Sequence, residues 1–292
     1  MPICNQRTVI ITGAGGGLGR AYALAFAAEG ANVVVNDIRL EAAEAVAAEA
    51  VAAGGRAIAN QGDITTMAGA QSIVDAAVAA YGEVHVLVNN AGILRDRMFV
   101  SLSEEDWDQV MRVHLKGHFC LANILGRRWR DAAKAGNRVD ARIINTSSGA
   151  GLQGSVGQSN YSAAKGGIAS LTLVQAAEMG RYGVTVNALA PAARTSMTES
   201  AMPDMVKAPQ DGSFDAWAAE NVAPLVVWLG SLASSHVTGK IFESQGGRIS
   251  ICDGWRTDAT RDKGARWEAA ELGPVIDQLL AQAVPAQKVW GS

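Results

Sequence analysis

The sequence has few cysteines, little net charge and no long apolar run. Its 292 residues include only three cysteines, Cys4, Cys120 and Cys252, which are too far apart for a CxxC pair or a disulfide framework. Lys and Arg total 25 against 28 acidic residues, so the net charge of -3 gives no sign of a nucleic-acid partner or of binding to an anionic membrane. No apolar stretch is long enough to span a bilayer, and a strand predicted from Thr8 leaves no room for a signal peptide. We therefore expect a cytoplasmic globular protein with no membrane partner and no nucleic-acid partner.

The first half of the chain alternates short β-branched runs with longer helical stretches. Near-continuous apolar strands separated by helices are typical of βαβ units, whose parallel sheet is covered on both faces. The fold class is therefore α/β, a parallel sheet in three αβα layers. The predicted strands cover 8–12, 32–36, 56–60 and 84–88, and the predicted helices cover 17–29, 40–53 and 67–81.

The second half continues this pattern with longer helices and then changes in composition. The predicted helices cover 103–128, 160–181 and 222–234, the predicted strands 142–145, 184–187 and 240–243, and the polar stretch 130–140 reads as a loop. No linker or repeat marks a boundary before about residue 253, where the chain becomes polar and a short helix is expected at 274–283. We expect residues 1–252 to form one domain. Residues 253–292 would form a C-terminal extension that packs on the same domain or on a neighbouring subunit.

A glycine-rich turn, residues 12–19 (Thr-Gly-Ala-Gly-Gly-Gly-Leu-Gly), lies between the first strand and the first helix. Glycines there let the backbone approach a pyrophosphate, and amide groups at the helix N-terminus hold its charge. Asp37 follows the second strand, 24 residues after Gly13, where a carboxylate can accept both adenosine ribose hydroxyls and repel a 2′-phosphate. The nearby Arg39 is the one feature that complicates this reading. The sequence thus favours NAD over NADP.

A second set of residues suggests acid–base chemistry. Tyr161 and Lys165 are spaced i, i+4 and so share one helix face, and Ser148 lies 13 residues before Tyr161. An ammonium beside a phenol favours the phenolate, so we expect Lys165 to lower the pKa of Tyr161 from its usual value of about 10. Tyr161 would then exchange protons near neutrality, and Ser148 would hydrogen-bond a substrate oxygen.

Together these motifs resemble the short-chain dehydrogenase/reductase family, from Thr8 to about Gly247. The resemblance implies a Rossmann-type, doubly wound parallel sheet and hydride transfer between a nicotinamide and a carbinol or ketone. The motifs that carry it are Thr12-Gly13-x-x-x-Gly17-x-Gly19, Asn89-Asn90-Ala91-Gly92, Ser148, Tyr161-x-x-x-Lys165 and Asn187-x-x-x-Pro191.

The family pattern also implies a role for each matching residue. Tyr161 would be the general acid/base, Ser148 would orient the reacting oxygen, and Lys165 would hold the nicotinamide ribose and tune Tyr161. Asp63 matches the adenine contact. The full set expected to bind the cofactor is Gly13, Gly15, Gly16, Gly17, Leu18, Gly19, Asp37, Asp63, Ile64, Asn90, Ala91, Gly92, Tyr161, Lys165, Pro191 and Thr195.

Two positions depart from the family. The usual catalytic Asn is replaced by His114, in Val-His-Leu-Lys-Gly, and a structural histidine and a proton-relay histidine are equally consistent with that position. His118 stands at i+4 from His114, but no third ligand is evident and no metal is expected. The glycine that usually follows Pro191 is missing, so the loop that leads to Thr195 on the nicotinamide side is altered.

Other segments resemble one subgroup of the family, the (3R)-hydroxyacyl-CoA dehydrogenase domain of the multifunctional enzyme of peroxisomal β-oxidation and the related actinobacterial enzymes of acyl-CoA and sterol catabolism. These segments are residues 35–37, 92–97, 112–117 with Trp107, and 222–229.

The remaining aromatic residues and methionines have simpler readings. Trp107, Trp129, Trp217 and Trp228 are expected to be packing anchors on helices. Met197, Met202 and Met205 fall where the family has a mobile substrate lid, and core filling is the equal alternative.

The leading hypothesis is an NAD-dependent dehydrogenase of CH–OH donors that converts a 3-hydroxyacyl-CoA, of fatty or steroid origin, to its 3-oxo thioester. The alternatives are a hydroxysteroid dehydrogenase for free steroids, a 3-oxoacyl carrier-protein reductase, and a non-catalytic NAD-binding sensor. From the family we expect a homodimer or homotetramer formed through the long helices predicted at 103–128 and 160–181.

Overall fold

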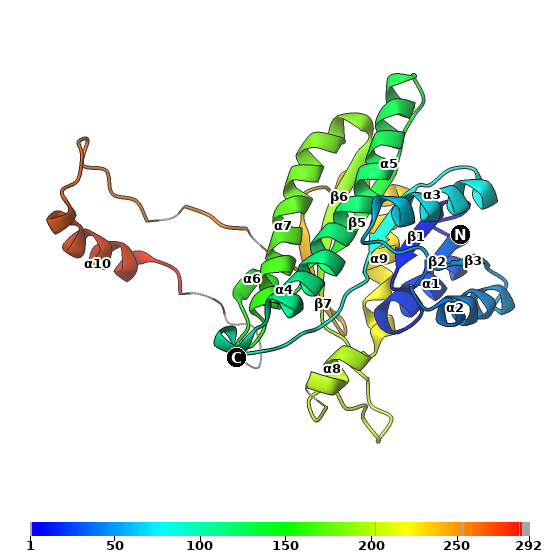
Figure 1. Cartoon of the computed structure of the whole chain (residues 1–292), viewed down its shortest axis with the longest axis horizontal. Helices are drawn as coiled ribbons and strands as arrows, with labels where there is room; N and C mark the ends of the chain where they lie inside the picture. Colours follow the sequence, from blue (N-terminus) through cyan, green and yellow to red (C-terminus); the bar gives the residue numbers. More distant parts are fainter. Residues whose placement is uncertain (1, 202, 253, 258, 286, 288–292) are drawn as a thin grey trace.

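The computed structural model describes residues 2–201, 203–252, 254–257, 259–285 and 287, and its centre is one eight-stranded sheet (Figure 1). The strand order is β3-β2-β1-β4-β5-β6-β7-β8, and every neighbouring pair is parallel except β7 and β8. The strand bounds are β1 Thr8–Thr12, β2 Asn32–Asn36, β3 Arg56–Asn60, β4 Val86–Asn89, β5 Ala141–Thr146, β6 Val184–Pro191, β7 Ile241–Gln245 and β8 Arg248–Cys252. The order reverses between β1 and β4, which places a crevice at the carboxyl ends of these strands.

Helices cover both faces of the sheet and create two separate apolar cores. One core packs α1, α2 and α9 against one face, and the other packs α3, α5 and α7 against the opposite face. The strands between them are buried on both sides, which explains why the three central residues of β1 and of β2 are all apolar. The helix bounds are α1 Gly17–Ala28, α2 Leu40–Ala52, α3 Met67–Tyr81, α4 Glu104–Met111, α5 Gly117–Lys134, α6 Gly149–Gln153, α7 Ser159–Met179, α8 Ser196–Ala201, α9 Ala223–Gly230 and α10 Leu272–Gln282.

The region predicted as one helix over 103–128 is three consecutive elements. A π-helical turn, Arg112–Lys116, separates α4 from α5, and a single-residue shift of this kind is not visible in the apolar periodicity. The loop predicted over 130–140 was also wrong in part, because α5 continues to Lys134. Trp129 anchors that last part: it is buried and its indole Nε1–H donates to the carbonyl of Val84 at 2.9 Å.

The late strands and helices also differ in extent from the sequence prediction. β6 runs four residues beyond the predicted end, to Pro191, and β7 begins and ends later than predicted. The hairpin partner β8 was missed, although its residues alternate polar and apolar; Ile249 and Ile251 are exposed at the edge of the sheet. The helix predicted over 222–234 is the shorter α9 between two 3₁₀ turns, Ala219–Asn221 and Leu232–Ser234.

The C-terminal extension stands away from the sheet (Figure 1). It contains α10 close to the predicted position, and none of the residues of this helix is buried, including Leu272, Ile276 and Leu280. Its packing on the same domain or on a neighbouring subunit stays a prediction. Among the described residues no helix is both long and apolar enough to cross a membrane.

Candidate active site

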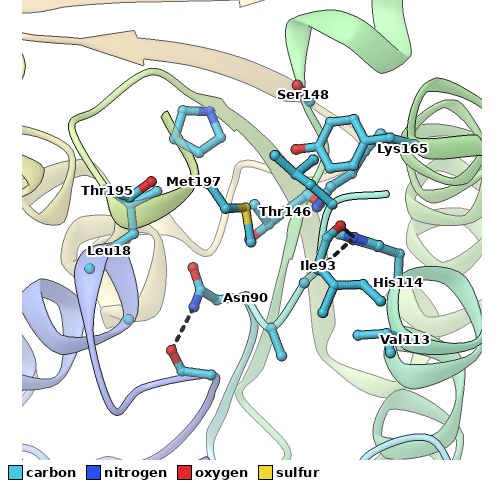
Figure 2. Close-up of a pocket in the computed structure, with 18 of the residues that line it drawn as sticks. Leu18, Asn90, Ile93, Val113, His114, Thr146, Ser148, Lys165, Thr195 and Met197 are labelled. Carbon is cyan, nitrogen blue, oxygen red and sulfur yellow. Dashed lines mark hydrogen bonds between the residues drawn. The ribbon is translucent and has the colours of Figure 1, made fainter. Parts of the chain in front are cut away.

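One cavity of about 890 Å³ opens at the carboxyl ends of the parallel strands. Each predicted site residue except Gly15 lines it, although these residues come from the ends of six different strands and from α1, the π turn and α7. Figure 2 shows Leu18 and Asn90 on one side of the cavity and Ser148, Lys165 and His114 on the other. Thr195 and Met197 reach the cavity from the segment that follows β6. The fold thus brings the predicted nucleotide residues and the predicted catalytic residues to one place.

The glycine-rich turn leaves room for a bound phosphate group at the N-terminus of α1. Gly13 has a φ of +61°, and a Cβ there would lie 2.8 Å from the Cα of Ala91, so a side chain is excluded. The Asn90 side-chain amide donates to the Thr12 carbonyl at 2.9 Å and to the Gly13 carbonyl at 3.3 Å, and these bonds fix the turn against the loop after β4. No side chain caps α1 at Gly16, so its first N–H groups are available to an anion.

Asp37 follows β2, and its carboxylate lies at the cavity wall with only 7% of the residue exposed. One oxygen accepts from the Gly15 N–H and the other from the Arg39 N–H, both at 3.0 Å. Gly15 therefore does not line the cavity itself, but its N–H holds the Asp37 carboxylate at the cavity wall. The Arg39 guanidinium lies 3.5 Å from the same carboxylate and its side chain is 70% exposed, so this arginine faces both Asp37 and solvent.

Asp63 and Ile64 lie in the loop between β3 and α3. The two carboxylate oxygens of Asp63 accept from the Thr65 N–H at 2.8 Å and from the Thr65 hydroxyl at 3.0 Å. This turn holds Asp63 at the cavity wall. The wall continues through Asn90, Ala91 and Gly92 after β4, so the set fits the adenosine half of a dinucleotide.

Ser148, Tyr161 and Lys165 meet because α6 packs closely on α7. Ser148 is the N-cap of α6, and a Cβ on Gly151 would lie 2.5 Å from the backbone carbon of Lys165, so this approach requires glycine. Tyr161 and Lys165 share a face of α7, with the Lys165 Nζ 5.5 Å from the centre of the Tyr161 ring. The Nζ donates to the Thr146 carbonyl at 2.6 Å.

Burial decides the protonation of these groups. It raises the pKa of Tyr161, and a hydrogen bond from Ser148 opposes that rise by favouring the phenolate. The pKa of Lys165 falls to about 7 because burial disfavours the ammonium. The sequence-based expectation of a lowered Tyr161 pKa therefore does not hold here, since desolvation of the phenolate is the largest effect and the Lys165 ammonium points at Thr146.

His114 sits in the π turn and is almost fully buried. Its Nε2 lies 2.7 Å from the Ile93 carbonyl (Figure 2), and its ring packs edge-on against Tyr161 with 5.2 Å between centroids. Burial and the nearby Lys165 lower the pKa of His114 to about 3, so the imidazole is neutral. These contacts suit a residue that positions Tyr161 and the loop after β4.

His118 performs a separate task from His114. Its Nε2 accepts from the Thr146 N–H at 3.3 Å, which anchors the residue whose carbonyl binds Lys165. Among the described residues no group of three His, Cys, Asp or Glu side chains is arranged to hold a metal ion.

Pro191 and Thr195 lie on the side of the cavity where β6 ends and α8 begins. A Cβ on Gly17 would lie 3.3 Å from the Thr195 Cγ2, so this loop reaches across to the glycine-rich turn. The Thr195 N–H donates to the Thr198 hydroxyl at 2.8 Å, which forms a tight turn at the start of α8. Met197 lines the cavity and Met205 does not, while Met202 lies outside the described residues.

Sequence reasoning missed several cavity residues, above all Trp217. It was read as a packing anchor on a helix, but it lies in a turn and lines the cavity. No periodicity distinguishes such a tryptophan from a core residue, because its place depends on a loop. By contrast, Trp129 on α5 is the buried anchor that the sequence predicted.

Comparison with known proteins agrees with this geometry. The family model described as short chain dehydrogenase matches residues 7–206. The hydroxyacyl-CoA dehydrogenase ChsB1 of Mycobacterium tuberculosis is 41% identical, over 97% of this chain and 91% of its own length. The mouse peroxisomal multifunctional enzyme type 2 is 42% identical over 93% of this chain, which spans only 34% of that longer protein.

A solved structure gives the same result for the fold. The crystal structure of a short chain dehydrogenase from Mycobacterium avium superposes with a TM-score of 0.91 and 55% identity, over 99% of this chain and all of that one. The resemblance read from the motifs, to the family and to the hydroxyacyl-CoA dehydrogenase subgroup, is confirmed, and so is the doubly wound fold.

Proposed function

This chain belongs to the short chain dehydrogenase family, and from that premise we propose that it interconverts a 3-hydroxyacyl-CoA and the 3-oxoacyl-CoA with NAD as its cofactor. The observation that carries the proposal is the convergence of Ser148, Tyr161 and Lys165 on the cavity that also holds the glycine-rich turn and Asp37. NAD, when bound, supplies a nicotinamide ring that accepts the hydride from the carbinol carbon.

The protein's own residues then handle the proton and the orientation of the alcohol. The Tyr161 phenolate accepts the hydroxyl proton as the carbon–hydrogen bond breaks, and it returns a proton in the reverse direction. Ser148 favours the Tyr161 phenolate and lines the same cavity, so a substrate oxygen placed between the two side chains would contact both groups. Lys165 would turn from Thr146 towards the ribose, and His114 would hold the Tyr161 ring in place from its edge.

The preference for NAD is supported by Asp37. Its carboxylate can accept two ribose hydroxyls, and a 2′-phosphate at that position would meet a negative charge. The Arg39 guanidinium lies 3.5 Å from this carboxylate, so the negative charge of Asp37 is partly neutralised.

The acyl-CoA substrate is supported by the subgroup resemblance and by the printed names of the relatives, hydroxyacyl-CoA dehydrogenase and peroxisomal multifunctional enzyme. The cavity wall beyond Tyr161 includes Met197, Trp217 and Val156, an apolar surface that suits a fatty or steroid acyl group. A free hydroxysteroid would fit the same wall and remains the alternative that the experiment must separate.

We also propose a cytoplasmic enzyme that forms a homodimer or homotetramer. Cys4 and Cys120 are buried free thiols, which fits a reducing compartment. Phe119, Leu173 and Val174 on α5 and α7 are about half exposed, which supports pairing through these helices, and the exposed α10 would then cover a neighbouring subunit. Light scattering on the purified protein tests this, and a monomer at micromolar concentration would contradict it.

The test of the function is NADH formation with a panel of 3-hydroxyacyl-CoA thioesters, free hydroxysteroids and simple alcohols, with NADP and a carrier-protein thioester run in parallel. We expect turnover on the CoA thioesters with NAD and little with NADP. Turnover on free steroids alone would remove the CoA assignment and keep the chemistry. Binding of NAD without turnover on any alcohol would favour the sensor reading.

A further inference from the structure

The segment between β6 and α9 forms a lid over the substrate side of the cavity. We define the lid as residues 194–217, of which all but residue 202 are described. Met197, Thr198 and Trp217 of the lid line the cavity. A segment of this length has a large conformational entropy when it is free, so something must hold it in the position that forms the cavity wall.

Arg194, the first residue of the lid, joins three points of the segment. Its guanidinium forms a two-pronged ion pair with Asp215, with one of the contacts at 3.2 Å, and its Nη1 also donates to the Val206 carbonyl at 2.9 Å. Its backbone N–H donates to the Trp217 carbonyl at 2.6 Å. Arg194 therefore fastens the start of the lid to its middle and to its end.

We call Arg194 and Asp215, with the bonds they make to Val206 and Trp217, the clasp. The clasp also orients Trp217. The Asp215 carboxylate accepts from the Trp217 N–H at 3.1 Å, so both backbone groups of this tryptophan bond to members of the clasp. The Asn221 side-chain amide donates to the Asp215 carbonyl at 2.8 Å, which ties the clasp to the 3₁₀ turn before α9. Neither Arg194 nor Asp215 lines the cavity, so the pair would act on a substrate only through Trp217 and the lid.

The Arg194–Asp215 pair differs from an ordinary surface ion pair in its burial and in the number of fixed acceptors around the guanidinium. The two side chains are 22% and 25% exposed, and Val206, which shares the guanidinium, is fully buried. Isolated exposed pairs contribute little, but a planar guanidinium with several fixed acceptors gives both geometric specificity and strength. Arg194 also lies three residues after Pro191, within the loop that departs from the family pattern.

We propose that Arg194 and Asp215 are positioning residues that set the affinity for the acyl substrate by fixing the lid and Trp217. The inference rests on the proposed function in one respect, that the molecule held under the lid is the alcohol being oxidised. The clasp fixes the part of the substrate-binding wall that the lid forms, and it takes no part in the proton transfer at Tyr161.

The kinetic test compares Arg194→Gln and Asp215→Asn with wild type on the best thioester of the panel. We expect the KM for the thioester to rise by about tenfold, with kcat and the KM for NAD changed by less than about threefold. Arg194→Lys keeps the charge but not the fork, so it should lie between wild type and Arg194→Gln. The matched control is Arg128→Gln, which breaks the exposed ion pair between Arg128 on α5 and Glu83 after α3; neither residue lines the cavity, so both KM values should be unchanged.

A second readout needs no turnover. Lys207 is exposed and directly follows the fully buried Val206, whose carbonyl the clasp binds. Opening the clasp should speed tryptic cleavage after Lys207 by about tenfold in Arg194→Gln and Asp215→Asn, and not in Arg128→Gln. Mass spectrometry of the fragments identifies the cut.

The two readouts separate the possible failures. Faster cleavage with a raised thioester KM supports the proposal. Unchanged cleavage overturns it, and so does faster cleavage with an unchanged KM, because the lid would then be held without affecting the substrate. A wild type that oxidised no thioester would refute the proposed function. The cleavage rates, together with the KM for whichever alcohol was turned over, would still decide the clasp.

Discussion

Cofactor selectivity is predicted to depend on one carboxylate, and replacing it should reverse the preference. In Asp37→Ala the two ribose hydroxyls lose an acceptor whose oxygens each hold one backbone N–H and have one free lone pair. A hydrogen bond to a charged group contributes about 1.5 kcal/mol at the low end of its range, so two of them amount to about 3 kcal/mol. We therefore expect kcat/KM for NAD to fall by on the order of a hundredfold.

Arg39 makes the reversal measurable. With Asp37 gone, its guanidinium loses the carboxylate 3.5 Å away and can face a 2′-phosphate, although its 70% exposure limits the gain to about 1 kcal/mol. The kcat/KM for NADP should then rise severalfold in Asp37→Ala, and Asp37→Ala/Arg39→Ala should lose that rise.

The assay is steady-state NADH and NADPH formation with one thioester at saturation. Asp75→Ala on α3 is the matched control, since that exposed carboxylate binds only Gln71 among the described residues and lies outside the cavity lining. An equal loss with both cofactors in Asp37→Ala would refute the reasoning, because it would mean that Asp37 maintains the turn and does not read the ribose.

Three further predictions concern the catalytic residues. Ser148→Ala removes the hydrogen bond that lowers the pKa of Tyr161, so the pH at half-maximal oxidation should move upward, and an unmoved profile would count against that bond. The pKa of Lys165 is about 7 in the folded chain and 10.5 in the unfolded chain. Between these pH values the unfolded chain binds more protons, so the free energy of unfolding rises with pH, by up to about 1.4 kcal/mol per pH unit. Denaturant titrations from pH 7 to 10 should show that this rise is lost in Lys165→Met; the same slope in both proteins would contradict the burial argument. His114→Ala should lower kcat about tenfold through loss of the Tyr161 ring contact, whereas His114→Asn keeps most activity because an amide can still bond the Ile93 backbone. Neither His114 variant should change the pH profile between 5 and 9, since the imidazole pKa is about 3, and a changed profile would instead indicate a proton relay.

The nucleotide half of the site was predictable from the sequence because its chemistry uses local patterns. A glycine turn after an apolar strand, and an aspartate after the next strand, are adjacent to the elements that position them. The structure accordingly places Gly13, Asp37 and Asn90 at one crevice.

The substrate half was harder to predict because it depends on contacts between distant loops. Trp217 reaches the cavity only because Arg194 and Asp215 hold the lid, and no spacing in the sequence links residues 194, 206 and 215. The π turn that carries His114 is equally invisible, since a shift of one residue leaves the apolar pattern nearly intact.

The sequence also could not give the protonation states of Tyr161 and Lys165. The i, i+4 spacing correctly placed Lys165 beside Tyr161, but the direction of a pKa shift depends on burial. Burial raises the pKa of Tyr161 and lowers the pKa of Lys165, because it disfavours the charged form of each group.

The most direct test of the account is NADH formation from a 3-hydroxyacyl-CoA by wild type and by Tyr161→Phe, with NAD binding measured in both proteins. Wild type should form NADH, and Tyr161→Phe should bind NAD with similar affinity while its kcat falls by about a thousandfold. Full turnover by Tyr161→Phe would contradict the assignment of Tyr161 as the acid/base. No NADH from any hydroxyacyl-CoA with the wild type would contradict the proposed function itself.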